Sequence, residues 1–349
     1  MIDRHVRDPI YGMIHLPDLA WKVIDTPLYQ RTRRIKQLAI VEYVYPSAVH
    51  TRFSHMIGTA HLAICVCDKL NIHGDDRIIL ILSALLHDIA HSVLSHIYEQ
   101  AGGSSHEKRS EMFIDAIAEQ VPEILIYTPA IKNIINGVCY DKNKPYMSQI
   151  VANHANGLDV DKLDYMVRDC YFTGIKCLVE VDRIISAMTL IDNNVAYNEK
   201  ILEDIANVFR TRYDLHRRVY QHRVVRVISV MICEILRENR YEPKTIEEWL
   251  TFTDDWFNQL RITGNERTKA IFHDLDTRCI WEASEEHSLI NSTDTIRRKL
   301  SSDNHIIHDE CTISCGYRGR IMVHTSKLVD IIELVPKDII IKRKIVCSH

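Results

Sequence analysis

The amino-acid sequence predicts a mostly α-helical fold with a small α+β lobe at its C-terminal end. Apolar residues recur at every third or fourth position from about residue 26 to residue 237, which is the periodicity of helices with one buried face. β-branched stretches instead gather after residue 305, where short polar turns separate them. We therefore expect a helical core over residues 1–285 and a C-terminal lobe over residues 286–349.

The first 20 residues are expected to form an extended or hairpin segment, because Asp8-Pro9 and Gly12 are turn signals. Helical stripes follow, and their apolar positions are Leu62, Val66 and Leu70; Ile78, Leu82, Leu85 and Ile89; and Ile201, Ile205 and Val208. Residues expected at the start of helices are Thr26 with Pro27, Asp75, and Ser104 with Ser105.

The lobe is predicted from the strings IIH, CTIS, RIMV and DIIIKRKIV, which lie between residues 305 and 347. The preceding stretch, 291–304, is polar, and we expect a mobile loop there.

Composition limits the classes of function. The net charge of the 349 residues is -4, so a general attraction to nucleic acid is not predicted. The apolar run 78–86 is too short to cross a membrane, and the first residues lack the apolar segment of a secretory signal, so we expect an intracellular protein. The ten cysteines are scattered, which indicates reduced thiols; zinc binding by the close pairs Cys65/Cys67 and Cys311/Cys315 is the weaker alternative.

The string LLHDIAHSVLSH, residues 85–96, is the strongest candidate for a site. His87 and Asp88 end an otherwise apolar helix, where a buried carboxylate is costly without a partner. A divalent metal would supply that partner, whereas a capped helix end with a surface aspartate is the structural alternative. His87 and His91 are four residues apart, so we expect them to share one helix face.

Two further strings contain residues that suit a metal site. RFSHMIGTAHLA carries His55, and GLDVDKLDYMVRDC carries four aspartates, which are Asp159, Asp161, Asp164 and Asp169. One aspartate that reaches into the helical core would complete a set of four ligands, although an isolated carboxylate is usually a solvated surface group. Imidazole and carboxylate together suit iron, manganese, zinc or nickel and do not choose among them.

In this combination, His55, His87-Asp88 and Asp161 resemble the H…HD…D signature of the HD superfamily. The strings RDPIYG, RIKQL, RFSHMIG, LLHDIAHSVLSH, GLDVDKLDYMVRDC and FRTRYDLHRRVYQH are similar, in order and spacing, to the vertebrate sterile-alpha-motif and HD-domain dNTP triphosphohydrolases. The resemblance covers roughly residues 4–285 and is fainter in the last 45. From the sequence we expect the catalytic core alone, without a sterile-alpha-motif domain before the first matching string.

This resemblance implies metal-dependent hydrolysis of dNTPs to deoxynucleoside and inorganic triphosphate. It implies a divalent metal (Fe, Mn, Mg or Zn) on His55, His87, Asp88 and Asp161, and a reaction centre lined by His91, His96, His106 and Glu107. The implied substrate-binding residues are Gln37, Leu38, Arg52, Lys162, Tyr165, Asp169, Arg212, His216, Tyr220 and Gln221. Without the resemblance, His91 and His96 would be interpreted as core histidines, and Tyr165 and Tyr220 as core aromatics.

Two other functions remain open at this point. One is an HD phosphohydrolase acting on a ribonucleotide, a cyclic dinucleotide or a nucleic-acid end. The other is a non-catalytic nucleotide-binding or nucleic-acid-binding protein, which a lost metal ligand would favour. All four expected ligands are present, so the sequence favours an enzyme.

The relatives implied by the resemblance are activated by nucleotides bound between subunits. Residues that match this regulatory site are Arg4, Asp25, Gln30, Arg33, Arg183, Lys200 and Arg278. Two positions depart from the pattern, because His5 replaces an aliphatic residue and Asn198 replaces an arginine; Lys327 is an uncertain match for the last lysine. We therefore expect a homo-oligomer whose assembly GTP or dGTP promotes, with weaker activator binding than in relatives with arginine at position 198.

Overall fold

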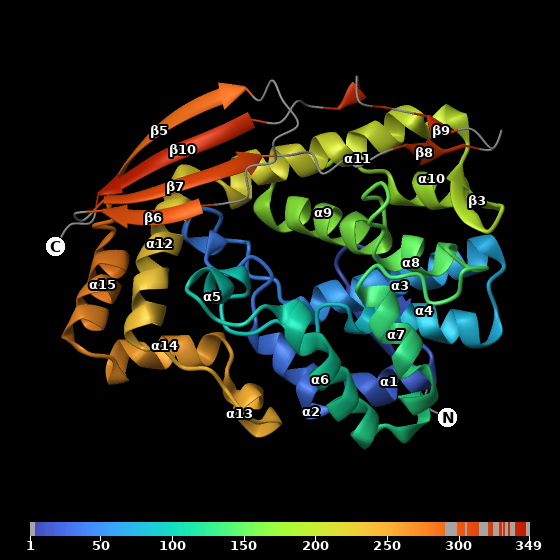
Figure 1. Ribbon diagram of the computed structural model, residues 1–349, viewed down its shortest axis with the longest axis horizontal. Helices are drawn as coiled ribbons and strands as arrows, with labels where there is room; N and C mark the ends of the chain where they lie inside the picture. Colours follow the sequence, from blue (N-terminus) through green and yellow to red (C-terminus); the bar gives the residue numbers. More distant parts are fainter. Residues whose placement is uncertain are drawn as a thin grey trace.

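The computed structural model describes residues 4–289, 299–303, 306–313, 320–323, 328–329, 331, 334–335 and 339–346. The mostly helical prediction is confirmed: helices make up most of the described chain, and a four-stranded sheet lies beside α12 and α15 at one end of the molecule (Figure 1). None of the described helices is both long and apolar enough to cross a membrane.

The expected N-terminal hairpin is present. β1 (His5–Asp8) pairs with β2 (Gly12–His15) in antiparallel register, and Gly12 has the positive φ of 73° that this turn requires. The next elements are α1 (Asp18–Ile24), α2 (Pro27–Gln30) and two short 3-10 helices, η1 (Arg31–Arg34) and η2 (Val41–Tyr43). The side chain of Thr26 caps α2, as expected from the sequence.

Three helices form the frame of the central core. α3 (Arg52–Leu70) packs against both α4 (Gly74–Leu86) and α9 (Val160–Thr173), and the predicted stripes on α3 and α4 are mostly buried. The prediction that Asp75 caps α4 is wrong, because His73 occupies the N-cap position and Asp75 lies in the first helical turn. The acidic side chain still lies where the helix dipole favours negative charge.

A β-hairpin that was not predicted from the sequence interrupts the helices after α4. β3 (Met188–Ile191) and β4 (Asn194–Tyr197) pair through Asp192 and Asn193, which both have positive φ. Aspartate and asparagine tolerate this conformation and are typical of two-residue hairpin turns. The other elements here are α5 (His96–Gln100), α6 (His106–Gln120), η3 (Pro122–Tyr127), α7 (Thr128–Ile135), α8 (Tyr146–Val151) and α10 (Val181–Ser186).

A local change of helix type occurs in the string LHRRVYQH. After η4 (Glu199–Ile201), α11 (Leu202–Leu215) continues into a π-helical turn, η5 (His216–Tyr220), and the chain resumes as α12 (Arg223–Glu238). Such π segments occur frequently at functional sites. The last helices are α13 (Ile246–Thr251), α14 (Asp254–Thr263) and α15 (Glu266–Thr277).

The C-terminal strands form an antiparallel sheet in the order β5-β10-β7-β6. Its members are β5 (Glu282–Leu289), β6 (Lys299–Asp303), β7 (Ile306–Ile313) and β10 (Ile339–Val346), and β8 (Ile321–Met322) pairs separately with β9 (Leu328–Val329). The predicted loop 291–304 is wrong over Lys299–Asp303, which forms β6, and its other residues lie outside the described chain. The predicted boundary at residue 285 falls within β5, so the division into core and lobe stays a prediction.

Buried charges join this sheet to α12. On β10, Arg343 faces the same side as two buried isoleucines, and it lies directly across from Glu285 on β5 and Asp309 on β7. Asp309 also forms an ion pair of 3.1 Å with Arg226 of α12. The sheet is therefore tied to the helix that follows the π turn. The eight cysteines in the described chain form no disulfide with one another, and Cys315 and Cys347 lie outside it, so the reduced state stays a prediction.

Candidate active site

Side chains from three helical segments converge at the expected metal site. The Nε2 atoms of His55 and His87 are 3.1 Å apart, and each also lies 3.2–3.7 Å from a carboxylate oxygen of Asp88 and of Asp161. Ligand atoms about 2.0–2.2 Å from one metal ion are about 2.8–3.6 Å apart at octahedral or tetrahedral angles. His55, His87 and Asp88 therefore form a group that could hold a divalent ion, and Asp161 lies within 3.5 Å of both histidines.

The other nitrogen of each histidine is held by the surrounding protein. His55 Nδ1 is hydrogen-bonded to Asp164 Oδ2 at 2.7 Å, and His87 Nδ1 is 2.8 Å from the carbonyl oxygen of Ala84 in the last turn of α4. A proton on Nδ1 leaves the Nε2 lone pair free for a metal, which is the usual arrangement in histidine metal sites. Asp161 and Asp164 are three residues apart on α9, so one helix face supplies both the ligand and the group that orients His55.

Electrostatics at this site favour ionised carboxylates. Burial by itself would raise the pKa of Asp88, but His87 and Arg52 lower it well below its usual range. Burial would lower the pKa of His55, but hydrogen bonds to Asp161 and Asp164 raise it to about 10. Buried carboxylates that raise the pKa of a neighbouring histidine stabilise positive charge, and the same charges can stabilise a divalent metal ion.

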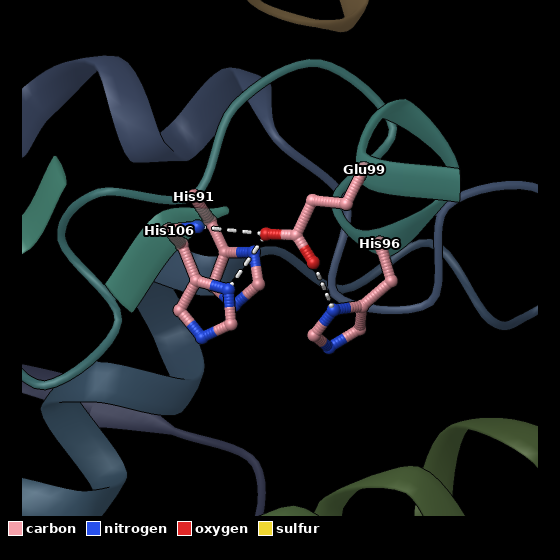
Figure 2. A group of neighbouring side chains, drawn as sticks. All are labelled: His91, His96, Glu99 and His106. Atoms are coloured by element: carbon pink, nitrogen blue, oxygen red, sulfur yellow. Dashed lines mark hydrogen bonds and ion pairs between the residues drawn. The ribbon is translucent and has the colours of Figure 1, made fainter. Parts of the chain in front are cut away.

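A second cluster contains His91, His96, Glu99 and His106 (Figure 2). The carboxylate of Glu99 lies between two rings, 3.1 Å from His96 Nδ1 and 2.8 Å from His106 Nδ1, and it also accepts the backbone N–H of His106. The rings of His91 and His106 are stacked at 3.9 Å. Burial lowers the pKa of His91 well below its usual range, with further lowering by Arg52 and His106, so this imidazole is neutral at pH 7.

The expectation that His87 and His91 share one helix face is wrong. α4 ends at Leu86, and the chain then turns away from the helix, as the bond from His91 N to the carbonyl of Asp88 shows. His87 consequently faces His55 while His91 joins the second cluster. Asp88 links the two clusters, since its Oδ1 lies 3.5 Å from His91 Nε2.

Both clusters border a cavity of about 480 Å³. Basic, aromatic and amide side chains line it, and Arg52 reaches it while bonded to Asp88 at 2.5 Å and to Ser95 Oγ at 3.2 Å. The predicted site residues brought together here are Gln37, Leu38, Arg52, Asp88, His91, His96, His106, Asp161, Tyr165, Asp169, Arg212, His216, Tyr220 and Gln221.

A smaller cavity of about 210 Å³ lies against the same metal site. His87, Asp88, His106 and Asp161 line it together with the predicted residues Glu107 and Lys162. The ammonium group of Lys162 is bound to Asp159 at 2.6 Å. Lys162 and Glu107 are thus placed beside the metal site but outside the lining of the larger cavity.

One wall of the larger cavity is a hydrogen-bonded group centred on Asp169. Its Oδ2 accepts the Tyr220 hydroxyl at 2.5 Å, and its Oδ1 lies 2.7 Å from Nε2 of His50. Tyr165 lines the same cavity one turn earlier on α9. His50 is not among the residues predicted from the sequence, where its only signal is its position two residues before Arg52.

Other functional residues were missed for a similar reason. Glu99 lies three residues after His96 on α5, a spacing that places two side chains on one helix face. Asp164 was noted only as one of four aspartates, and its partner Arg168, fully buried and bound also to Asp8 at 2.8 Å, was not noted. These residues act on their partners through the tertiary fold, which spacing alone does not reveal.

The predicted regulatory residues fall into separate places. Arg4 forms a bidentate pair with Asp25 at 2.6 and 2.9 Å, and Arg33 donates to Gln30 at 2.9 Å. The remaining three lie on other elements: Arg183 pairs with Asp204, Lys200 lies in η4, and Arg278 donates to the carbonyl of Tyr43. A nucleotide site that uses both groups stays a prediction.

Comparison with known proteins agrees with this geometry. Residues 52–169 match the HD domain and residues 179–311 match the HD associated region. The SAMHD1 homolog of Dictyostelium discoideum, a deoxynucleoside triphosphate triphosphohydrolase by name, is 30% identical in an alignment of 326 residues that covers 85% of this chain and 62% of the relative. SAMHD1 of Gallus gallus is 33% identical over 66% of this chain and 44% of its own length, and SAMHD1 of Homo sapiens is 32% identical over 65% and 43%.

The chain thus spans about two fifths to three fifths of the length of these relatives. The HD domain match begins at Arg52 and ends at Asp169, so it contains all four expected metal ligands. The chain therefore contains a match to an HD domain followed by a match to an HD associated region, and it is similar to the corresponding part of the SAMHD1 proteins.

Proposed function

We propose that the protein is a metal-dependent phosphohydrolase that converts deoxynucleoside triphosphates to deoxynucleoside and inorganic triphosphate. The observation that carries this proposal is the position of the expected metal ligands Asp88 and Asp161 in the wall of a 480 Å³ cavity whose other walls bear three arginines and two tyrosines. The names of the SAMHD1 relatives support the same activity.

The metal would be held by His55, His87, Asp88 and Asp161, and we propose Fe, Mn, Mg or Zn as candidates. When bound, such an ion polarises phosphoryl oxygens and lowers the pKa of water toward about 7. The triphosphate carries about four negative charges, which need fixed cations. Arg52 and Arg212 supply them in the larger cavity, while Lys162 supplies one from the smaller cavity.

Hydrolysis at the α-phosphorus forms a bond to a water-derived oxygen and breaks the bond to the 5′-oxygen, which then needs a proton. We assign that proton to His96, which lines the cavity and is oriented by Glu99 at 3.1 Å. His106 is held by the same carboxylate, so Glu99 fixes both rings relative to the substrate. The neutral His91 adds no charge to the cavity, and its Nε2 faces Asp88 Oδ1 at 3.5 Å.

We assign the sugar to the wall formed by Tyr165, Asp169 and Tyr220. The bond between the Tyr220 hydroxyl and Asp169 holds this wall in place. A rigid wall that an added 2′-hydroxyl would meet can discriminate more strongly than a merely apolar pocket, which gives about 10²-fold. dATP and dGTP should therefore be far better substrates than ATP and GTP, and equal hydrolysis of both sets would contradict the assignment.

The decisive assay measures triphosphate released from each dNTP and from GTP, with added Mn²⁺ or Mg²⁺. Release from dNTPs alone supports the proposal. Release from GTP, or hydrolysis of a cyclic dinucleotide or a nucleic-acid end, would indicate an HD phosphohydrolase of another specificity. No hydrolysis but measurable nucleotide binding would indicate a binding protein.

The metal's role is tested by replacing His87 and Asp88 together with alanine. We expect the loss of bound metal and a fall in activity on the order of 1,000-fold, because metal catalysis supplies several kcal/mol. Circular dichroism should still report a folded helical protein. Full activity of this variant would contradict the metal mechanism.

We also propose a homo-oligomer, at least a dimer, whose assembly GTP or dGTP promotes. A ligand bound between subunits stabilises only the assembled state, so nucleotide and assembly are thermodynamically linked. Asp25 would accept from a guanine edge, and Arg33 with other cations would hold the phosphates. Mass measurement in solution with and without GTP tests this, and a fully active monomer indifferent to GTP would refute it.

A further inference from the structure

His50 is a buried histidine at the sugar end of the larger cavity. Its side chain is 1% exposed, and its ring stacks on Phe172 with centroids 4.5 Å apart and an interplanar angle of 13°. It precedes α3 by two residues, in a segment where Lys36 and Thr51 form an isolated β-bridge. Burial and the stack on Phe172 therefore restrict the orientation of this imidazole.

Two hydrogen bonds connect His50 to residues assigned to the substrate. Nε2 of its ring lies 2.7 Å from Oδ1 of Asp169, and its backbone carbonyl accepts the N–H of Gln37 at 2.9 Å. A carboxylate only accepts, so the ring nitrogen is the donor. Nδ1 is buried and finds no partner within the described chain, which favours the tautomer with its proton on Nε2.

The two partners of His50 both face the larger cavity. Gln37 is 9% exposed, and its Oε1 is buried without a hydrogen-bond partner among the described residues. Asp169 is 1% exposed, and Tyr220 holds its second oxygen. A buried amide oxygen left unpaired is costly, so a hydroxyl donor from a ligand is the group that this corner of the cavity lacks.

We propose that His50 is a positioning residue that fixes Asp169 as the acceptor of the single proton of the sugar 3′-hydroxyl, with Gln37 held beside it. This inference rests on the proposed function and adds a specificity determinant to it. In this proposal His50 does not contact the substrate. Its ring orients the carboxylate of Asp169, and its backbone carbonyl holds the backbone N–H of Gln37. Because the orientation of Asp169 depends on this contact, His50 controls recognition of the 3′-hydroxyl more than it controls the metal.

The test compares dATP with 2′,3′-dideoxy-ATP in three variants. His50→Leu removes the donor to Asp169, and the preference for dATP in kcat/KM should fall about ten-fold, the effect of one hydrogen bond to a charged group. His50→Gln places an amide N–H near the position of Nε2 and should restore most of the preference. His61→Leu, at a half-buried histidine of α3 that lines neither cavity, should leave it unchanged.

Bound metal should be equal in all variants, which separates this role from damage to the metal site. If His50→Leu does not fold, His50→Asn replaces it, because its shorter amide cannot reach Asp169, and the preference should again fall. The proposal would be overturned if His50→Leu kept the wild-type preference for dATP, or if His50→Gln lost as much of that preference as His50→Leu. If the wild-type protein hydrolyses no dNTP, calorimetric binding of deoxyadenosine against dideoxyadenosine tests His50 independently.

Discussion

Gly58 of α3 offers a sharp test of how closely the metal site depends on the α3–α9 contact. A Cβ atom at this position would lie 2.0 Å from Oδ1 of Asp164 and 2.3 Å from Nη2 of Arg168. Both side chains are fully buried and bonded to each other at 2.9 Å, so neither can swing into solvent. Gly58→Ala must therefore displace the carboxylate that orients His55.

The size of the effect follows from two opposing contributions. Alanine stabilises a helix interior by about 1 kcal/mol relative to glycine. Disrupting a buried ion pair costs about 3–5 kcal/mol. The net result should be a loss of about 2–4 kcal/mol in the free energy of unfolding, together with a fall in metal affinity of about 10–100-fold, because an outer-shell partner of a ligand is disturbed.

Urea unfolding and metal titration measure the two effects separately. In an Asp164→Ala background the carboxylate is absent, so the added methyl group should cost less than it does in the wild type. Gly58→Ala with wild-type or higher stability and unchanged metal affinity would refute the reasoning.

Two further predictions concern buried charges near the active site. Arg31 is 1% exposed, donates to the carbonyl of Ile89 at 2.6 Å and has no carboxylate partner in the described chain. Arg31→Met should therefore change the free energy of unfolding by no more than about 1 kcal/mol. Its kcat should fall about ten-fold because the turn that leads to His91 loosens, and a wild-type kcat would contradict this prediction. Burial raises the pKa of Asp254 to about 6, and this effect outweighs the opposite effect of two backbone N–H groups that bind the carboxylate. From about pH 4 to 6, Asp254 is therefore protonated in the folded protein but ionised in the unfolded chain. Stability falls as the pH rises through this window, and between pH 5 and 7 the wild type should lose about 1 kcal/mol relative to Asp254→Asn in urea unfolding; parallel pH profiles would contradict the prediction.

Local patterns were sufficient where one element determines its own structure. The stripe on α3 and the Thr26-Pro27 start of α2 follow from helix periodicity and capping, and the hairpin β1–β2 follows from its turn residues. The β3–β4 hairpin also had a local signal in Asp192-Asn193, but the surrounding helical periodicity concealed it. At the end of α4 the same periodicity misplaced His91, because the chain leaves the helix where the reacting groups lie.

The sequence by itself determined the residue types of the expected metal site and the helices that carry them. This was possible because a His-Asp pair at the end of an apolar helix is explained either by a bound metal ion or by a capped helix end. Resemblance then selected Asp161 among four aspartates. Only the tertiary structure decided which groups support the ligands: Asp164 behind His55, Glu99 between His96 and His106, and His50 behind Asp169. The physical reason is that these bonds cross between segments up to 119 residues apart, and hydrogen bonding depends on distances that form only when the helices pack.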